Sequence, residues 1–269
     1  MRCWAHPAVT EPSGIAGKMD SSTASKPPLS LVYAANRDFL PFALVSMVSA
    51  IRSQTRWCHL HLIHDGDIDS EYQERVRRFI DQQGASIDVH SVPASFPREF
   101  AKHTRWDVSV LFRLAMTQIV PSNLQRVVYI DADTIVRRPI DEMFEIELGE
   151  TGLGAIPESH EAVQRLGLDK DATYLNSGIL AIDLDKWRAN QTCEQMMQLV
   201  MQDPERWVFP DQDILAVQFK GQWRRLPPEF NVTHRFFSGP DSLPLPTEDP
   251  FIIHFTGRGE KPWQTHQPH

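Results

Sequence analysis

The apolar run Val127–Ile130 ends abruptly at two carboxylates, Asp131 and Asp133, with only Ala132 between them. A short apolar run that stops at polar residues is typical of a buried strand. In α/β sheets, ligands bind in the crevice beyond the carboxyl ends of the strands. Two acids in that position repel each other and lose solvation, so they require a compensating cation. A divalent metal ion that carries a phosphorylated substrate meets this requirement.

Strand and helix patterns alternate along the rest of the chain. Residues 1–28 are rich in Ser, Pro, Thr, Gly and Ala, which predicts a flexible leader. After it we expect strands at 29–35, 59–64, 86–90 and 251–255, helices at 39–52, 70–83, 108–120, 190–202 and 211–219, a short glycine-containing segment at 151–157 and an apolar run at 174–183. This alternation predicts an α/β fold with a mostly parallel sheet covered by helices.

Composition excludes several classes of protein. The net charge is -8 and the pI about 5.7, so neither nucleic acid nor an anionic membrane is expected as the main partner. Cys3, Cys58 and Cys193 are odd in number and scattered, which favours a reducing cytosol over a disulfide framework. No apolar run reaches the roughly 18 residues of a spanning helix, and no secretion signal is evident.

His254 is the candidate third ligand for a cation at the acids. In an extended strand, alternation would place Asp131 and Asp133 on the same side. The alternatives are a turn for the two acids and an ordinary core position for His254. Gly257, Gly259 and Lys261 follow the last strand and offer close backbone approach and a positive charge, which suit a diphosphate. Two carboxylates with an imidazole favour manganese or magnesium over zinc.

Three further groups could contact a sugar or a phosphate. The amide of Asn176 can bind sugar hydroxyls, although Asn176-Ser177-Gly178 also fits a turn. The Asp211-Gln212-Asp213 run could face a sugar or cap a helix. Arg113 could hold a phosphate, neutralise one of the acids, or extend along the surface.

Four motifs occur together in one order: 128–133, 174–178, 210–215, and His254-Phe255-Thr256-Gly257 through Lys261-Pro262-Trp263. The set resembles glycosyltransferase family 8, whose retaining enzymes include glycogenin and bacterial lipopolysaccharide galactosyl- and glucosyltransferases. The resemblance covers about residues 29–263. It implies a single domain there with a GT-A fold, a Rossmann-like α/β architecture with a mixed, mostly parallel sheet, and leaves a tail at 264–269.

The resemblance also implies roles for individual residues. Asp131, Asp133 and His254 would bind Mn2+ or Mg2+, and Gly257 and Lys261 would contact the diphosphate of a UDP-sugar. Ala34 and Asn36 would meet the uridine, although the family often has an acid at the position of Asn36. The remaining donor contacts would come from Arg113, Ala132, Glu158, Asn176 and Asp211, with Gln212 beneath the anomeric carbon.

The expected activity is therefore transfer of galactose or glucose from a UDP-sugar to a hydroxyl of a glycan or glycolipid, with retention, by a cytoplasmic protein with at most peripheral membrane contact. Because the Gln212 amide is a poor nucleophile, front-face attack is favoured over a double displacement through Asp211. Loops at 91–106 and 228–249 are the candidate acceptor sites. Two alternatives are a catalytically silent UDP-sugar-binding protein and a haloacid-dehalogenase-like phosphatase that uses Asp131.

Overall fold

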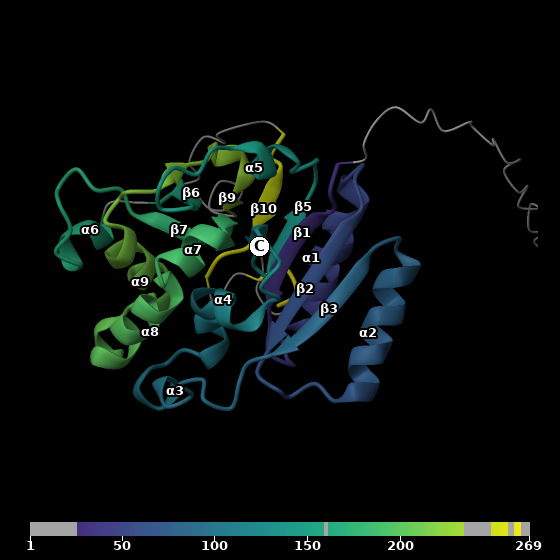
Figure 1. Ribbon diagram of the computed structural model, residues 1–269, viewed down its shortest axis with the longest axis horizontal. Helices are drawn as coiled ribbons and strands as arrows, with labels where there is room; N and C mark the ends of the chain where they lie inside the picture. The colour runs from purple at the N-terminus through teal and green to yellow at the C-terminus, as the bar shows by residue number, and fades with distance from the viewer. Residues whose placement is uncertain (1–25, 159–160, 234–248, 258–260, 265–269) are drawn as a thin grey trace, which may run out of the picture.

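A seven-stranded mixed sheet forms the centre of the protein in the computed structural model, with the strand order β3-β2-β1-β4-β7-β6-β8 (Figure 1). The structure describes residues 26–158, 161–233, 249–257 and 261–264. The strands of this sheet are β1 (Leu29–Ala34), β2 (Cys58–His64), β3 (Ser86–Ser91), β4 (Arg126–Ile130), β6 (Leu153–Pro157), β7 (Leu175–Asp183) and β8 (Arg224–Arg225).

Strands β1 to β4 run parallel, whereas β7 runs antiparallel to both of its neighbours, β4 and β6. The short β8 pairs parallel with β6. The sheet is therefore mixed and mostly parallel, and the α/β fold class predicted from the sequence is confirmed. The central strands are buried on both faces, since every residue of β7 from Leu175 to Ile182 is buried. Such strands appear in a sequence as continuous apolar runs.

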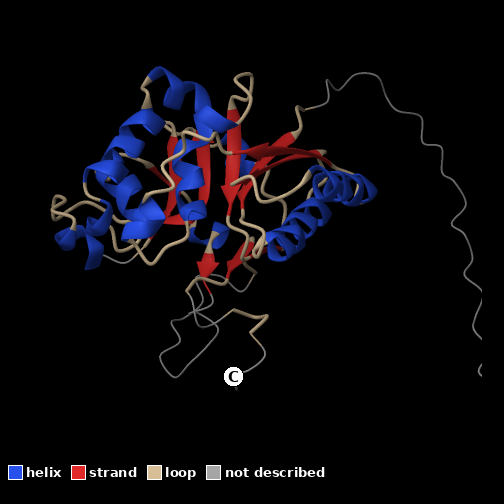
Figure 2. Cartoon of the chain, turned by 90° about the horizontal axis from the view of Figure 1, so that it is seen from below, coloured by secondary structure: helices blue, strands red, loops and turns tan. Residues whose placement is uncertain are grey.

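Helices cover both faces of the sheet (Figure 2). On one face, α1 (Leu40–Ser53) and α2 (Ser70–Gln82) pack against apolar side chains of β1 and β2. On the other face, the 3-10 helix η1 (Val108–Ala115) packs with α7 (Leu184–Ala189), α8 (Thr192–Gln202) and α9 (Pro210–Phe219). The remaining short helices are α3 (Phe100–His103), α4 (Met116–Ile119), α5 (Glu142–Glu145), α6 (Glu161–Arg165), η2 (Pro204–Arg206) and η3 (Pro228–Phe230). None of the helices in the described ranges is both long and apolar enough to cross a membrane.

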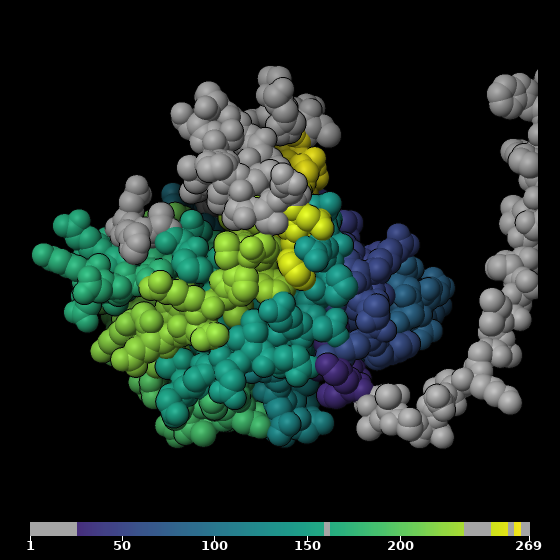
Figure 3. Space-filling model, turned by 90° about the horizontal axis from the view of Figure 1, so that it is seen from above, coloured from purple at the N-terminus to yellow at the C-terminus, as the bar shows by residue number. Residues whose placement is uncertain are grey.

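A second, three-stranded sheet has the order β5-β10-β9 and lies beyond the carboxyl end of β4. It consists of β5 (Thr134–Val136), β9 (Val232–Thr233) and β10 (Ile252–His254). In its antiparallel pairing with β5, His254 lies opposite Thr134. Segments far apart in the sequence therefore lie side by side, as the contact between the teal and yellow surfaces in Figure 3 shows.

Two predicted helices differ from the structure in detail, and one prediction about the acid pair was wrong. The helix expected at 108–120 is a 3-10 helix, Val108–Ala115, followed by the single α-helical turn α4. The helix expected at 190–202 begins at Thr192, after Gln191 has adopted a φ of 52°. Asp131 and Asp133 do not lie on one extended strand, since a turn at Ala132–Asp133 separates β4 from β5.

Some predictions fall outside the described residues. These are most of the leader (1–25), Gly259, residues 234–248 of one expected acceptor loop, and residues 265–269 of the tail.

Candidate functional site

The two acids after β4 converge on His254, although by a turn and not by strand alternation. His254 Nε2 lies 3.6 Å from Asp131 Oδ2 and 3.3 Å from Asp133 Oδ1. The turn places both carboxylates at the carboxyl edge of the main sheet, and the pairing of β10 with β5 brings the imidazole to them. One ligand atom from each of the three residues lies within 4.8 Å of the others. Such a group can hold a metal ion.

Gly178 on β7 makes this convergence possible. A Cβ atom at position 178 would lie 2.2 Å from His254 Cε1 and 2.9 Å from Asp131 Oδ2. No side chain fits there, and only glycine lets the imidazole and the carboxylate approach the strand so closely. The sequence had been interpreted as a turn or a sugar-binding motif at this position, and the close approach was not foreseen.

A chain of hydrogen bonds fixes the orientation of the His254 ring. The chain begins at Glu158, whose Oε2 accepts from Asn176 Nδ2 at 2.9 Å. Asn176 Oδ1 then accepts from Asn231 Nδ2 at 2.7 Å. Asn231 Oδ1 accepts from His254 Nδ1 at 2.9 Å, so Nε2 is the ring nitrogen that faces the two acids.

Asn231 was missed by the sequence reasoning. It lies between the short η3 and β9, in a stretch without any strong local pattern, and only its position next to His254 reveals its role.

Arg113 balances two acids from a buried position. Its Nη2 lies 2.9 Å from Asp131 Oδ1 and its Nη1 lies 3.1 Å from Asp211 Oδ2. Nη1 also donates to the Ser177 carbonyl, and the guanidinium lies 4.6 Å from the centroid of the Tyr129 ring. Arg113 therefore lies beside one acid of the Asp131–Asp133 pair and is buried, whereas its contact with a phosphate stays a prediction.

The surroundings shift the pKa values of Asp131 and Asp133 in opposite directions. Burial raises the pKa of Asp131, and although Arg113 opposes this, the neighbouring Asp133 adds to it. Burial also opposes ionisation of Asp133, but His254 and Lys261 outweigh it and hold the pKa of Asp133 below its usual value. Lys261 Nζ donates to both Asp133 Oδ2 and the Phe255 carbonyl. Lys261 thus contacts an acid of the pair directly.

Ser177 joins the sugar-facing candidates to this centre. Its hydroxyl donates to Asp211 Oδ2 at 2.6 Å, and its backbone N–H donates to Gln212 Oε1 at 3.1 Å. Asp211 and Gln212 therefore lie beside β7, close to Arg113. Asp213 has a different role, because it is fully buried and accepts from Arg165, Tyr174 and the backbone N–H groups that precede α9.

The other predicted donor contacts border the same edge of the sheet. Ala34 ends β1, and Ala132 lies in the turn between the acids. Asn36 Oδ1 accepts from the Phe39 N–H before α1, so one of its lone pairs is already engaged. Gly257 has a φ of 88° and open space around its Cα, as a close backbone approach to a ligand would need.

The sequence profile of Glycosyl transferase family 8 matches residues 30–267, which is most of the chain. The chain belongs to glycosyltransferase family 8. It is 25% identical to General stress protein A of Bacillus subtilis over 80% of each chain. It is also 25% identical to lipopolysaccharide 1,2-glucosyltransferase of Escherichia coli K12, over 87% of this chain and 72% of that protein.

Solved structures agree with this family assignment at the level of the fold. The galactosyltransferase LgtC, solved with donor and acceptor sugar analogues, has a TM-score of 0.75 at 22% identity and covers 88% of this chain and 90% of its own. The glycosyltransferase GlyE of Streptococcus pneumoniae has a TM-score of 0.70 at 21% identity, over 89% of this chain and 57% of its own. The GT-A fold expected from the sequence is confirmed, and the family makes this chain a glycosyltransferase.

Proposed function

We propose that this family 8 member transfers galactose or glucose from a UDP-sugar to an acceptor hydroxyl, with retention of configuration. The observation that carries the proposal is the convergence of Asp131, Asp133 and His254 with two cations, Arg113 and Lys261, at the carboxyl end of β4. A diphosphate leaving group needs positive charge from a metal ion and from placed cations.

The donor set fits Mn2+ or Mg2+. Two carboxylates supply hard oxygen ligands, and His254 would present Nε2 to the ion because its Nδ1 faces Asn231 Oδ1. Asp131, Asp133 and His254 would hold the ion. When bound, it would neutralise charge on the departing UDP. Burial and the neighbouring Asp133 raise the pKa of Asp131, so a bound cation beside the pair would favour the ionised form of its carboxylate.

The chain's own residues would bind and orient the donor. Ala34 and Asn36 would meet the uridine, and Ala132 and Gly257 would approach the donor with little steric bulk. Lys261 would contact the β-phosphate, where negative charge develops. Glu158, Asn176 and Asp211 would bind sugar hydroxyls, and Arg113 would keep Asp211 in place for this task.

Front-face attack fits the contacts of Asp211 better than a double displacement does. The Asp211 carboxylate already accepts from the Ser177 hydroxyl at 2.6 Å and pairs with Arg113 at 3.1 Å. A carboxylate engaged in this way is a weakened nucleophile, and the neighbouring Gln212 is an amide. The acceptor hydroxyl would then lose its proton to the departing phosphate.

Acceptor and location are proposed from the family. A carbohydrate or glycolipid hydroxyl, as in lipopolysaccharide synthesis, is the proposed acceptor, since relatives at 25% and 22% identity are named lipopolysaccharide glucosyl- and galactosyltransferases. Residues 29–263 would form the single catalytic domain and act in the cytoplasm, at most peripherally at a membrane.

Mn2+-dependent hydrolysis of a panel of UDP-sugars tests the proposal, because it needs no acceptor. We expect turnover of UDP-galactose or UDP-glucose that Asp133→Ala lowers by at least about 100-fold. Binding of a UDP-sugar by calorimetry without turnover would instead identify a silent binding protein. Wild-type turnover by Asp133→Ala would refute the metal assignment. A glycosyl adduct on Asp211, trapped and seen by mass spectrometry, would refute front-face attack.

A further inference from the structure

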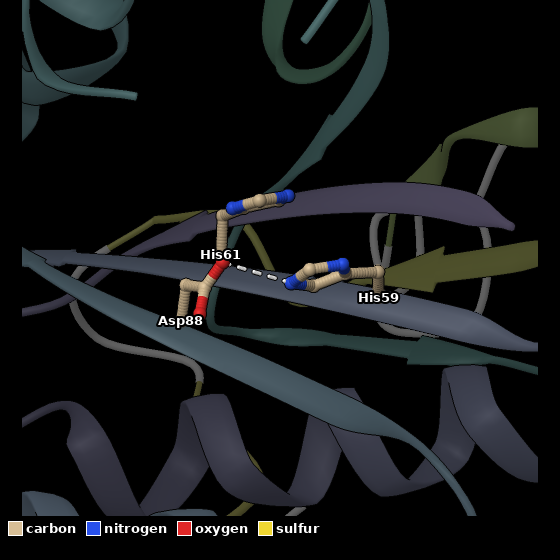
Figure 4. A group of neighbouring side chains, drawn as sticks. All are labelled: His59, His61 and Asp88. Carbon is tan, nitrogen blue, oxygen red and sulfur yellow. Dashed lines mark hydrogen bonds and ion pairs between the residues drawn. The ribbon is translucent and has the colours of Figure 1, made fainter. Parts of the chain in front are cut away.

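A second group of metal-ligating side chains lies on β2 and β3, apart from the catalytic site. His59, His61 and Asp88 each offer one ligand atom within 4.8 Å of the others (Figure 4). The parallel register pairs His61 with Asp88, so their side chains lie on the same face of the sheet. His59 precedes His61 by two residues on β2, so its side chain lies on that face as well. β1 separates β2 from β4, so β2 lies about 10 Å across the sheet from the strand that leads to the acid pair.

The contacts within this group leave one buried lone pair without a partner. His61 Nδ1 lies 3.1 Å from His90 Nε2, whereas His61 Nε2 is buried and has no hydrogen-bond partner. The His61 residue is only 2% exposed. If His61 donates from Nδ1 to His90, Nε2 carries no proton and can bind a metal ion. The hydrogen bond to His90 then fixes the orientation of the ring, as in most metal-binding histidines.

The other two ligands lie at the solvent side of His61. His59 Nε2 and Asp88 Oδ2 are hydrogen-bonded, 2.9 Å apart, and the two side chains are 36% and 51% exposed. The rings of His59 and His61 are stacked with centroids 4.6 Å apart. Metal–ligand bonds of about 2 Å bring neighbouring ligand atoms to about 3.3 Å from each other. The exposed side chains of His59 and Asp88 can close this gap by small rotations, and solvent gives the ion a path of entry.

We propose that His59, His61 and Asp88 form a second metal site, selective for a nitrogen-preferring divalent transition metal such as Zn2+. Two imidazoles with one carboxylate match the ligands of Zn2+ sites, whereas Mg2+ and Mn2+ prefer oxygen-rich sets like that of Asp131 and Asp133. The ion replaces the proton of the His59–Asp88 hydrogen bond. His90 supports the site by accepting from His61 Nδ1. Burial lowers the pKa of His61 to about 4, so its ring is neutral and able to ligate at neutral pH.

The site would tie the edge strand β3 to β2. Three protein ligands leave room for water on the ion, so the metal would be exchangeable and sensitive to the supply of free Zn2+. Binding to the folded chain alone would raise its stability by mass action.

The test is a count of bound Zn2+ on the full-length chain without an affinity tag, by equilibrium dialysis and elemental analysis. Wild type is expected to bind one more Zn2+ per chain than His59→Gln or Asp88→Asn. This difference cancels binding at the acid pair and at the histidines near the termini, which all three proteins share. His90→Gln is expected to weaken binding at the cluster by about 10- to 100-fold.

His103→Gln is the matched control, because His103 is also exposed and lies 4.0 Å from the carboxylate of Glu205. It should bind as many Zn2+ ions as wild type. The Tm of wild type should rise on addition of Zn2+ by more than that of His59→Gln. Equal Zn2+ counts in wild type, His59→Gln and Asp88→Asn, with circular dichroism showing all three folded, would overturn the proposal and leave the cluster as a hydrogen-bonded surface network.

Discussion

Replacing Gly178 by alanine is expected to separate His254 from the two acids. The added Cβ would lie 2.2 Å from His254 Cε1 and 2.8 Å from His254 Nδ1. Carbon atoms in contact prefer separations of about 3.5–4.0 Å, so the ring has to retreat by more than about 1 Å. A metal site tolerates deviations of only about 0.2 Å in its ligand distances. The imidazole would therefore be lost as a ligand.

The expected losses follow from that displacement. Mn2+ affinity, measured by calorimetry on the purified chain, should fall by at least about 10-fold. Loss of a residue that only hydrogen-bonds a metal ligand already lowers metal affinity about 10- to 100-fold. Mn2+-dependent hydrolysis of the UDP-sugar should fall by about 100-fold, the effect of a misplacement of about 1 Å. Measuring affinity and turnover separately distinguishes loss of metal from loss of donor orientation.

Gly154→Ala is the matched control. Gly154 lies on β6 in the same sheet. A Cβ there would lie 2.8 Å from Leu148 Cδ2 and would contact none of the three candidate metal ligands. Both variants should lower Tm, because both overpack the interior by one methyl group. Only Gly178→Ala should lose Mn2+ affinity. A folded Gly178→Ala protein with wild-type Mn2+ affinity would refute the placement of His254 as a ligand.

Three further substitutions test other contacts of the site. Asn231→Ala should lower Mn2+ affinity about 10- to 100-fold in calorimetry. Asn231→Asp should lose less, because a carboxylate also accepts from His254 Nδ1 although it cannot donate to Asn176 Oδ1. Equal loss in both variants would contradict the orienting role. Arg113→Gln should lower the free energy of unfolding in urea by about 3–5 kcal/mol, since it leaves Asp131 and Asp211 buried without their cation. A change below about 1 kcal/mol would show that Asp131 is not ionised in the folded protein. Asp213→Asn should lower the free energy of unfolding by about 3 kcal/mol by breaking the pair with Arg165, yet it should leave Mn2+ affinity unchanged, and a loss of affinity would place Asp213 in the site.

The roles of Asp213 and Asp211 show a limit of sequence reasoning. Both acids belong to the same short run at the start of α9, and their residue types are identical. One faces Ser177 and Arg113 at the site, whereas the other is fully buried against Tyr174 and Arg165. Helical rotation separates them, but the elements packed against each side of α9 decide which acid is structural.

The fold class and the chemical character of the site follow from local patterns of residues. Buried central strands appear in it as apolar runs, and acids that follow such a run have few roles other than binding a cation or forming a turn. Asp131, Asp133, His254 and Lys261 could therefore be selected from local context and spacing. The four ordered motifs then added the family.

How these residues meet depends on long-range packing. The turn at Ala132, the pairing of β10 with β5, the absence of a side chain at Gly178 and the hydrogen-bond chain from Glu158 through Asn231 all join segments distant in sequence. Local patterns record the period of a helix or strand, but they carry no record of which partner packs against it. For the same reason the alignment of His59 and His61 with Asp88 is invisible in the sequence, since strand register is set by the packing of the whole sheet.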